Sequence, residues 1–388
     1  MAASSATAPR DPALSDEQRD FVDAVRDFCA REITPERLRE LTGDFDDLHS
    51  EAVARQMAEL GWYGLTIPEE YGGSGGSFSD AVLFLEETAR GEAPIGAYGV
   101  TLIVVGALNR FGSEDQKRDL LGHVASGGSL AIAMSEPEAG SDVASLTTRA
   151  TREDDEWVVD GAKTWCSYAH KASHILIVCR TTRGDSPHEG LSMLLVPRDA
   201  PGLTVTPIET LGGTETNELH LDGVRVPGGA LLGTEGGGWT QLMAGLNNER
   251  VILAASALGL AQRAFDVALA YVKERRQFGR PVGTFQALQH RFAELATELE
   301  QTRLLVRSVA RLTDEDPGRM LPREASMAKL AATELAKRCA LEGLQSMGGY
   351  GYATEYPMER YLRSAVVTTI YGGTSEIQKN IIAKTLGL

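Results

Sequence analysis

A single glutamate, Glu249, stands inside an apolar helical stretch and is the side chain in this sequence best placed for acid–base chemistry. Helical periodicity over residues 238–273 puts Leu246 and Leu253 on the same face as Glu249, because the spacings are three and four. None of its neighbours on that face can pair with a charge. A carboxylate in such surroundings has either a partner from another segment or a raised pKa and a chemical task. A salt bridge across a domain boundary and a general base are both open at this point.

Other patterns that could carry chemistry indicate neither a nucleophile nor a metal site. The run at 72–76 reads Gly-Gly-Ser-Gly-Gly, but the preceding Pro-Glu-Glu argues against the strand that a nucleophile elbow requires, so a flexible loop is expected. His170 and His174 are four residues apart on an expected strand, where that spacing does not bring two ligands together. The four cysteines form no CxxC motif and no pairing pattern: Cys29, Cys166, Cys179 and Cys339.

At 388 residues the chain is long enough for two or three packed units. Its formal net charge of −16 argues against nucleic-acid binding, which needs a basic surface, yet permits a phosphate-bearing cofactor held by local arginines and backbone amides. The longest apolar run, near 100–108, is too short to span a bilayer. The first residues have neither the basic start nor the hydrophobic core of a secretory signal. We expect a disordered leader at 1–13, no membrane attachment and a cytoplasmic location.

The hydrophobic periodicity changes twice along the chain. Residues 14–127 have a helical pattern, with helices expected from about Ser15, at 50–60 and at 80–89. Residues 128–232 have the pattern of short strands, and the pair Asp160-Gly161 predicts a hairpin turn. This stretch contains no GxGxxG between a strand and a helix, and the chain has no phosphate-binding GxxxxGK[ST].

Residues 233–388 are helical again. Helices are expected at 238–273, 284–313, 322–346 and 356–369, with a short terminal helix from about residue 375. Long helices joined by short connections predict a bundle. Because helices and strands are segregated, the expected fold is an α+β multidomain chain with a helical N-terminal domain, a small middle β-domain or barrel, and a C-terminal four-helix bundle.

Several motifs recur in an order and spacing that extend over nearly all of the chain. They are LSDEQRDFVDAVRDF, GLTIPEEYGGSG, AMSEPEAGSD, VVDGAKTWCS, LDGVRVP, ERRQFGRPVGTFQ, QSMGGYGYATEYPMERYLR and YGGTSEIQ. On these motifs the whole chain resembles the acyl-CoA dehydrogenase family of flavoproteins, whose fold has the same three parts.

The resemblance implies one FAD per subunit, between the β-domain and the bundle. Ala133, Met134 and Ser135 match the strand that hydrogen-bonds the pyrimidine edge of the flavin. Trp165 matches the indole beside the isoalloxazine, and Ser167 matches the hydroxyl that contacts N5. A flat polarised ring needs donors along its edge and an apolar wall on its face, and these residue types supply both. For Trp165 the alternative is a plain core position in a small β-domain.

In the family a neighbouring subunit grips part of the ADP half of FAD, so the resemblance implies a homodimer or a homotetramer. Arg275 has the right chemistry for a diphosphate, and Gly348-Gly349 allows close backbone approach. The positions that match cofactor contacts here and in the terminal motif are Arg275, Gln277, Phe278, Gln286, Gln345, Gly348, Gly349, Thr374 and Glu376.

The terminal motif departs from the family pattern. Many members place the catalytic glutamate directly after the tyrosine of a Y-E-G-T motif, where this chain has Tyr371 followed by Gly372, Gly373 and Thr374. A subset resembling isovaleryl-CoA dehydrogenase instead has the base in an L-x-x-E-R segment of the first bundle helix, and the residues 246–250 match that pattern. The resemblance and the apolar setting therefore indicate the same residue, Glu249.

The resemblance implies α,β-dehydrogenation of an acyl thioester, in which Glu249 removes the α-proton while a hydride passes to flavin N5. The backbone N–H of Gly372 is expected to help polarise the thioester carbonyl, and burial to raise the pKa of Glu249 above about 4.3. The family implies electron-transfer flavoprotein as the electron acceptor. For Arg250 a structural role is the alternative to substrate binding. The positions that match substrate contacts are Ser141, Asn247, Arg250 and Tyr371.

Three alternatives stay open. The thioester carrier is either CoA or an acyl carrier protein, since no motif separates the two. A flavin monooxygenase or oxidase on the same fold is the second alternative. A non-catalytic partner subunit of a hetero-oligomer is the third, suggested by the missing glutamate at position 372. The stretch Tyr168-Ala169-His170 differs from the usual family sequence at the pocket mouth, and the sequence does not fix the length or branching of the acyl chain.

Overall fold

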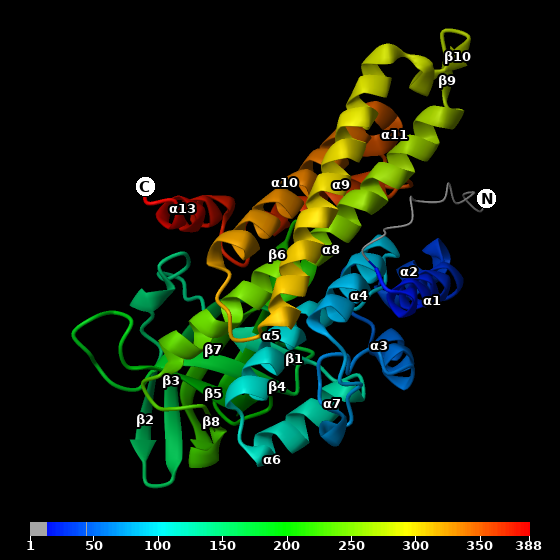
Figure 1. The fold of residues 1–388 in the computed structure, drawn as a ribbon. Helices are drawn as coiled ribbons and strands as arrows, with labels where there is room; N and C mark the ends of the chain where they lie inside the picture. Colours follow the sequence, from blue (N-terminus) through cyan, green and yellow to red (C-terminus); the bar gives the residue numbers. More distant parts are fainter. Residues whose placement is uncertain (1–13, 44) are drawn as a thin grey trace.

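The structure is a computed structural model that describes residues 14–43 and 45–388, so the leader predicted at 1–13 lies outside the described residues. A helical region, a β-sheet region and a bundle of long helices follow one another along the chain (Figure 1). Helices and strands are segregated in this way, as the periodicity predicts for an α+β chain.

Helices of the first region begin at capping residues that the sequence displays. Ser15 Oγ accepts from the Gln18 N–H at 3.1 Å while the Gln18 side chain accepts from the Ser15 N–H at 3.3 Å, which is a capping box. Ser77 forms the same box with Asp80, so this helix begins at Phe78, before the predicted residue 80. The helices are α1 (Asp16–Glu32), α2 (Pro35–Leu41), α3 (Glu51–Glu59), α4 (Phe78–Arg90), α5 (Gly96–Phe111), α6 (Glu114–Gln116) and α7 (Gly122–Ala125), with a π-helical turn at Lys117–Leu121.

The glycine-rich run at 72–76 is a loop, as predicted. It follows a 3-10 helix, Glu69–Tyr71, and the Ser74 hydroxyl donates to Gly61 O at 2.7 Å, which ties the loop to the end of α3. A Cβ at Gly73 would lie 2.0 Å from Ile67 O, so the close backbone approach requires glycine there.

The second region is a sheet with the strand order β6-β7-β3-β2-β4-β5-β8, and β1 pairs in parallel with β4. Most other neighbours in the sheet are antiparallel. Inward-facing side chains such as Trp157, Val159 and Ile175 form a separate buried core. The strands are β1 (Leu130–Ala133), β2 (Arg149–Glu153), β3 (Glu156–Ser167), β4 (His174–Arg180), β5 (Leu191–Pro197), β6 (Leu203–Thr210), β7 (Gly213–Pro227) and β8 (Leu231–Leu232).

The hairpin turn predicted at Asp160-Gly161 is wrong. Both residues lie inside β3, where the pairing register with β7 shifts between Val159 and Gly161. Gly161 has φ of 149°, a conformation that serves a β-bulge as well as a turn, and a Cβ there would lie 2.5 Å from Thr148 Oγ1. The actual turn is at Asp154, with φ of 53°, and it joins β3 to β2, a strand that the sequence pattern did not reveal.

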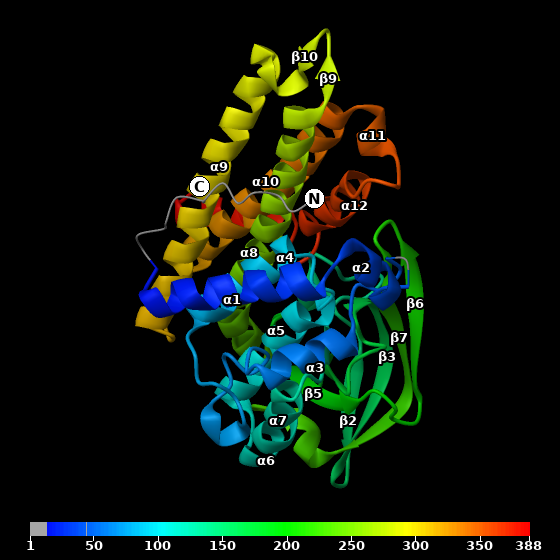
Figure 2. The same cartoon turned by 90° about the vertical axis from the view of Figure 1, so that its right-hand side faces the viewer.

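The third region is a bundle in which α8 is the central helix. Figures 1 and 2 show α8, α9 and α10 side by side, with the β9–β10 hairpin at the tip farthest from the sheet. α8 also packs against α4 and α5 of the first region. The four long helices agree with the predicted ranges to within two residues at each end. The elements are α8 (Gly238–Glu274), β9 (Arg276–Gln277), β10 (Arg280–Pro281), α9 (Gln286–Glu315), α10 (Pro322–Met347), α11 (Gly349–Tyr352), α12 (Met358–Thr368) and α13 (Ser375–Thr385).

Helix α8 corrects the expectation that the longest apolar run lies near 100–108. An 18-residue window of α8 has a mean hydropathy of 1.4, so by length and composition the helix could cross a membrane. However, 61% of that window is buried inside the protein. This is the burial of a core helix, and the apolar residues of α8 are explained by the helices that surround it.

Buried ion pairs fix the first region to the bundle. Glu86 on α4 accepts from Arg303 at 2.9 Å and from Arg307 at 3.0 Å, both on α9. Glu92, which follows α4, pairs with Arg263 of α8 at 2.6 Å. A buried carboxylate is tolerated only with such partners. The pairs therefore fix α4 against α9 and α8.

Candidate active site

Glu249 is buried on α8, with 7% of its surface exposed, and it has no ion pair or hydrogen bond among the described residues. The salt bridge across a domain boundary, one of the two alternatives from the sequence, is therefore ruled out. Burial raises the pKa of Glu249 to about 7, while the charges of Arg250 and Lys329 act in the opposite direction. The predicted rise in pKa is confirmed, and its cause is desolvation in an apolar setting.

The turn that follows α12 lies against this carboxylate. A Cβ built on Gly372 would lie 3.7 Å from Glu249 Oε1 and 2.1 Å from Leu253 Cδ1. Gly372 has φ of 60°, the left-handed region in which glycine carries no steric penalty. Its N–H donates to no protein group among the described residues. The turn thus places a free backbone donor next to a carboxylate with a pKa of about 7.

The residues matched to the flavin edge come together at the end of β1. Ala133 is the last residue of β1, and Met134 and Ser135 continue the chain beyond it. Ser135 O accepts from the Thr164 N–H at 3.0 Å, and Met134 O accepts from Lys163 Nζ at 3.0 Å. These bonds hold the segment beside β3, so its remaining backbone groups form an edge next to the strand that carries Trp165 and Ser167.

Trp165 stands out from the sheet. The indole is 62% exposed, and its backbone has φ of 59° where the register with β7 shifts between Lys163 and Cys166. The plain core position considered for this tryptophan is therefore wrong. Ser167 follows at the end of β3 and pairs with Thr216 of β7. An exposed flat indole next to a free strand edge fits one face and one edge of an isoalloxazine ring.

Most residues matched to the ADP half of FAD line one cavity of about 510 Å³ at the tip of the bundle. Arg275 lies over the ring of Tyr350 at 5.4 Å, and Gly348 has φ of 61° with open space where a Cβ would stand. Phe278, 92% exposed, lies between β9 and β10, and Gln286 begins α9, so these two lie outside the cavity lining. The matched residues in the lining are Arg275, Gln277, Gln345, Gly348 and Gly349.

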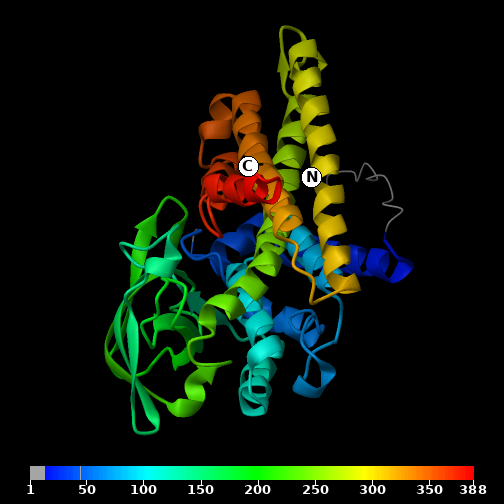
Figure 3. The same cartoon turned by 60° about the vertical axis from the view of Figure 1, so that its left-hand side comes forward.

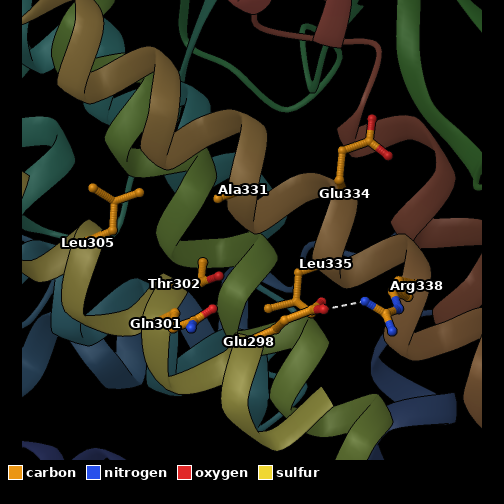
Figure 4. Close-up of a pocket in the computed structure, with 8 residues that line it drawn as sticks. All are labelled: Glu298, Gln301, Thr302, Leu305, Ala331, Glu334, Leu335 and Arg338. Atoms are coloured by element: carbon orange, nitrogen blue, oxygen red, sulfur yellow. Dashed lines mark hydrogen bonds and ion pairs between the residues drawn. The ribbon is translucent and has the colours of Figure 1, made fainter. Parts of the chain in front are cut away.

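A second cavity of about 400 Å³ lies between α9 and α10, and Figure 4 shows the residues around it. An ion pair between Glu298 and Arg338 crosses the cavity, and Leu305, Ala331 and Leu335 supply apolar walls. None of the site residues predicted from the sequence lines it. This cavity therefore contributes nothing to the site around Glu249.

Two of the residues matched to substrate contacts bond to each other on α8. Arg250 Nη1 donates to Asn247 Oδ1 at 3.0 Å, and Arg250 Nε is buried without a partner among the described residues. Burial lowers the pKa of Arg250. The unpaired Nε leaves a donor for a substrate group, although the bond to Asn247 also fits a structural role. Ser141 is exposed on the loop after β1.

The terminal motif combines an open tyrosine with a helix cap. Tyr371 is 39% exposed beside Gly372. Thr374 Oγ1 accepts from the Ile377 N–H at 3.3 Å and so caps α13, and Glu376 is exposed in the first turn of that helix. The Thr374 hydroxyl already has this bond within the chain, and the predicted cofactor contacts of Thr374 and Glu376 stay predictions.

The unusual stretch after Ser167 is fixed by contacts from other regions. A Cβ at Gly96 would lie 1.9 Å from Tyr168 Oη, so this buried tyrosine packs under the start of α5. His170 lies in the turn before β4, not on a strand as predicted, with Nδ1 3.0 Å from Asn217 Oδ1 and Nε2 3.6 Å from Asp47. Among the residues that the structure describes, no cluster could hold a metal ion.

Sequence reasoning missed three buried polar side chains around the site: Lys163, Lys329 and Gln378. Lys163 pairs with Glu136 at 2.8 Å behind the flavin edge, and Lys329 and Gln378 donate to the turn that carries Gly372. Lys329 stands in an apolar helical stretch between Ala328 and Leu330, the signal that drew attention to Glu249. Applied to lysines, the same criterion would have found it.

Comparisons with known proteins agree over the full length. Models of the N-terminal, middle and C-terminal domains of acyl-CoA dehydrogenases match residues 15–128, 131–224 and 236–387. A probable acyl-CoA dehydrogenase of Bacillus subtilis is 39% identical over 380 residues, which are 96% of this chain and 98% of that protein.

Solved structures give the same result. An acyl-CoA dehydrogenase from Geobacillus kaustophilus superposes with a TM-score of 0.91 at 35% identity, covering 97% of this chain and all of that one. A glutaryl-CoA dehydrogenase from Mycobacterium smegmatis, solved in complex with FADH2, has a TM-score of 0.86 at 28% identity, covering 96% and 95% of the two chains.

The fold and the site define a flavin-dependent oxidoreductase with a buried, unpaired carboxylate beside the terminal motif, among the described residues. The chain belongs to the acyl-CoA dehydrogenase family. It is an FAD-dependent enzyme that dehydrogenates acyl-CoA thioesters, as the resemblance predicts. The residues present fit that cofactor, because the free strand edge, the exposed Trp165 and the Arg275 cavity supply a ring edge, a ring face and a diphosphate site.

Proposed function

We propose that Glu249 is the base that removes the α-proton of the acyl thioester and that the Gly372 N–H polarises the thioester carbonyl. The observation that supports this is the buried Glu249 carboxylate, without a partner among the described residues, 3.7 Å from where a Gly372 Cβ would stand. A general base is most effective when its pKa lies near the working pH, and the pKa of Glu249 is about 7.

The two groups have complementary tasks. Removing a proton next to a thioester carbonyl places negative charge on the carbonyl oxygen, and a preorganised N–H at that oxygen stabilises the charge. Glu249 is buried next to the apolar Ile252 and Leu253, so the carboxylate is largely desolvated and has no ionic partner among the described residues. When bound, FAD supplies the acceptor for the hydride that leaves the β-carbon.

The test is anaerobic reduction of the FAD-loaded protein by a panel of short, branched and long acyl-CoAs, followed by flavin absorbance. Wild-type protein should lose its visible absorbance with at least one of them, and Glu249→Gln should lose the reaction while keeping FAD and melting at a temperature no lower than that of wild type. If Glu249→Gln is reduced as fast as wild type, Glu249 is not the base. If no acyl-CoA reduces the flavin but a thioester of an acyl carrier protein does, the carrier of the acyl group is the acyl carrier protein.

The active unit is proposed to be a homodimer or a homotetramer. Figure 1 shows the β9–β10 hairpin at one end of the bundle and the sheet at the other. The cavity adjoins the hairpin, since Arg275 and Gln277 line it, whereas Trp165 lies on β3 of the sheet. One FAD cannot easily be shared between the two ends of one chain, so the cavity is assigned to the cofactor of a second copy. Light scattering that finds a monomer with FAD fully bound would contradict this.

Electron-transfer flavoprotein is proposed as the electron acceptor, by analogy with the family. The exposed Val367 and Ile370, which precede the terminal motif, support a docking partner there. Reduced enzyme should be reoxidised faster by an electron-transfer flavoprotein than by dioxygen, and the reverse order would favour an oxidase. The cytoplasmic location stays a prediction from the sequence, and cell fractionation tests it.

A further inference from the structure

The Gly372–Gly373 turn is held from behind by a fully buried lysine of α10. Lys329 Nζ donates to Gly373 O at 3.0 Å and to Thr368 O at 2.9 Å. Thr368 is the last residue of α12, so the ammonium group also satisfies a carbonyl at a helix C-terminus, where positive charge is favourable. One side chain thereby joins α10, the end of α12 and the turn.

A second buried side chain, Gln378, also donates hydrogen bonds to the turn. Gln378 on α13 donates from Nε2 to Gly372 O at 3.0 Å and to Gly373 O at 2.8 Å. In Figure 3 the red terminal helix, α13, lies beside the orange α10, so the two donors approach the turn from neighbouring helices. The carbonyls of both glycines are therefore bonded by side chains of Lys329 and Gln378.

These three hydrogen bonds hold the turn in a conformation that glycine alone would not keep. Gly372 and Gly373 have φ of 60° and 81°, and two consecutive glycines form the most flexible backbone available. Among the described residues, no other group donates to either carbonyl, and the Gly372 N–H stays free. Removing the donors would release the turn, and with it the direction of that N–H.

Lys329 is also the cation that faces Glu249 from another helix. The charges that act on Glu249 are Arg250 on its own helix and Lys329 on α10. Those that act on Lys329 are Glu249, Glu334, Arg250 and Glu376, and burial lowers the pKa of Lys329 to about 8. Because no hydrogen bond joins Lys329 to Glu249 in the described part of the chain, the attraction acts through space and leaves both carboxylate oxygens free.

We propose that Lys329 is a positioning residue for the reaction. Through Gly373 it orients the Gly372 amide toward the substrate carbonyl, and from the same point its charge attracts the Glu249 carboxylate and favours the proton-accepting form. This rests on the proposed roles of Glu249 and Gly372. The lysine acts through its bond to Gly373 and through its charge on Glu249, and so affects both proposed catalytic groups at once.

The test compares three variants of the FAD-loaded enzyme. Lys329→Met removes the charge and the hydrogen bonds but keeps a long unbranched side chain, and Lys329→Arg keeps the charge. Lys379→Met removes an exposed lysine of α13 and is the control. Each variant is measured for α-proton exchange of an acyl-CoA in D2O, for anaerobic flavin reduction across pH, and for amide hydrogen exchange over residues 369–376.

Lys329→Met should slow α-proton exchange about tenfold or more, since a misdirected oxyanion donor costs at least that much. It should move the acid-side inflection of the reduction rate up by about one pH unit, because Glu249 loses its interior cation. Amide exchange in the turn should become faster. Lys329→Arg should restore the inflection, and Lys379→Met should change nothing. If Lys329→Met keeps all three wild-type values, the proposal is overturned.

If Lys329→Met does not fold, Gln378→Met tests the same proposal. Gln378→Met loses two of the three bonds to the turn and no charge, so it should speed amide exchange and slow α-proton exchange without moving the inflection. Unchanged α-proton exchange in a turn that has become mobile would reject the positioning role. Failure of the underlying function looks different, because Glu249→Gln would then retain α-proton exchange with Lys329 intact.

Discussion

Gly372 lies against Glu249, and a Cβ built on Gly372 would stand 3.7 Å from Glu249 Oε1. In members of the family with a Y-E-G-T motif, the glutamate side chain projects from this same position. The glutamate of that motif and the proposed base Glu249 would therefore occupy the same space, and a chain can use one of the two positions. Glycine at 372 is what allows the α8 carboxylate to stand unpaired beside the turn.

The first prediction concerns Gly372→Glu, which would place two carboxylates in that space. Like charges in a buried site raise the pKa of one of them, and the new side chain would also meet Leu253 Cδ1, 2.1 Å from the built Cβ. We expect flavin reduction to fall by about tenfold or more, from the loss of an ionised, well-placed base. Stopped-flow reduction by the best acyl-CoA measures it.

Gly372→Ala separates backbone strain from charge. Alanine at φ of 60° is expected to cost about 1 kcal/mol of stability and to displace Leu253. The control is Gly106→Ala on α5, where a Cβ meets open space and a helical glycine is replaced by a better helix former. It should raise the melting temperature and leave the rate unchanged. A Gly372→Glu enzyme as fast as wild type would show that the two positions do not compete.

The second prediction links activity to stability through Glu249. Its pKa is about 7 in the folded state, against an ordinary value of 4.5 for a glutamate side chain, so the folded protein binds the proton more tightly than the unfolded chain. The free energy of unfolding therefore falls as pH rises from about 4.5 to about 7, by up to about 3 kcal/mol. Glu249→Gln removes this penalty and should be more stable than wild type at pH 8.

Thermal melts at pH 5 and pH 8 measure this difference. At pH 5 the wild-type carboxyl is mostly protonated in the folded state, so the two proteins should melt at similar temperatures. At pH 8 Glu249→Gln should melt about 3–4 °C higher, because each kcal/mol shifts the melting temperature by about 1 °C in a chain of 388 residues. A mutant that is less stable at pH 8 would mean that Glu249 has an ionic partner after all.

The third prediction concerns the buried pair behind the flavin edge. Lys163 Nζ is 2.8 Å from Glu136 Oε1, and burial opposes ionisation of Glu136, but Lys163 and hydrogen bonds from Thr147 and Thr148 hold its pKa at about 2. Lys163→Met leaves that charge unpaired and should destabilise the protein by about 3–5 kcal/mol. Because Lys163 also donates to Met134 O, FAD should bind more weakly.

Two further variants show whether the loss of stability in Lys163→Met comes from the unpaired buried charge. The double variant Lys163→Met/Glu136→Gln removes both charges. Compared with Lys163→Met alone, it should therefore recover much of the lost stability, but not the FAD affinity. Lys171→Met breaks a half-exposed ion pair with Asp47 and should cost about 1 kcal/mol or less. Chemical unfolding and flavin fluorescence give both quantities. Equal losses from Lys163→Met and Lys171→Met would show that burial of the pair is unimportant.

The sequence revealed Glu249 because everything needed to recognise it is local. Its apolar helical neighbours are three and four residues away, and the helix periodicity shows them directly. Long helices such as α8 and α10 were predicted to within two residues for the same reason. What surrounds a carboxylate along its own helix can be read from the chain, and this is enough to predict its raised pKa.

Other features depend on contacts between distant segments. Lys329 donates to Gly373, 44 residues later, and no periodic pattern connects the two. Asp160-Gly161 suits both a hairpin and a β-bulge by its conformational preference, and only the pairing with β7 decides between them. For Trp165 the family match favoured a place beside the flavin, but a core position stayed open until the register shift in β3 and the exposure of the side chain excluded it. Tertiary contacts fix these outcomes.

The fourth prediction tests whether the cavity at the bundle tip serves the cofactor of a second copy. Arg275→Glu places a negative charge where a diphosphate is expected and should weaken FAD binding about tenfold or more, since one charge-assisted bond is lost and one repulsion gained. Arg276→Glu, on the neighbouring exposed hairpin position, is the control and should bind FAD nearly as well as wild type.

Hybrid oligomers show whether Arg275 contacts the FAD of its own chain or the FAD of a second copy. At limiting FAD each variant is expected to be inactive when expressed alone: Arg275→Glu because it binds FAD weakly, and Glu249→Gln because it lacks the proposed base. Coexpression of the two chains gives hybrid oligomers. If the grip comes from the second copy, a hybrid has one complete site, because the intact Glu249 of one chain faces FAD held by the intact Arg275 of the other. Such hybrids, isolated with two different tags, should then recover close to half of the wild-type activity. If each chain grips its own FAD, every site in the hybrid lacks either the base or the grip, and no activity returns.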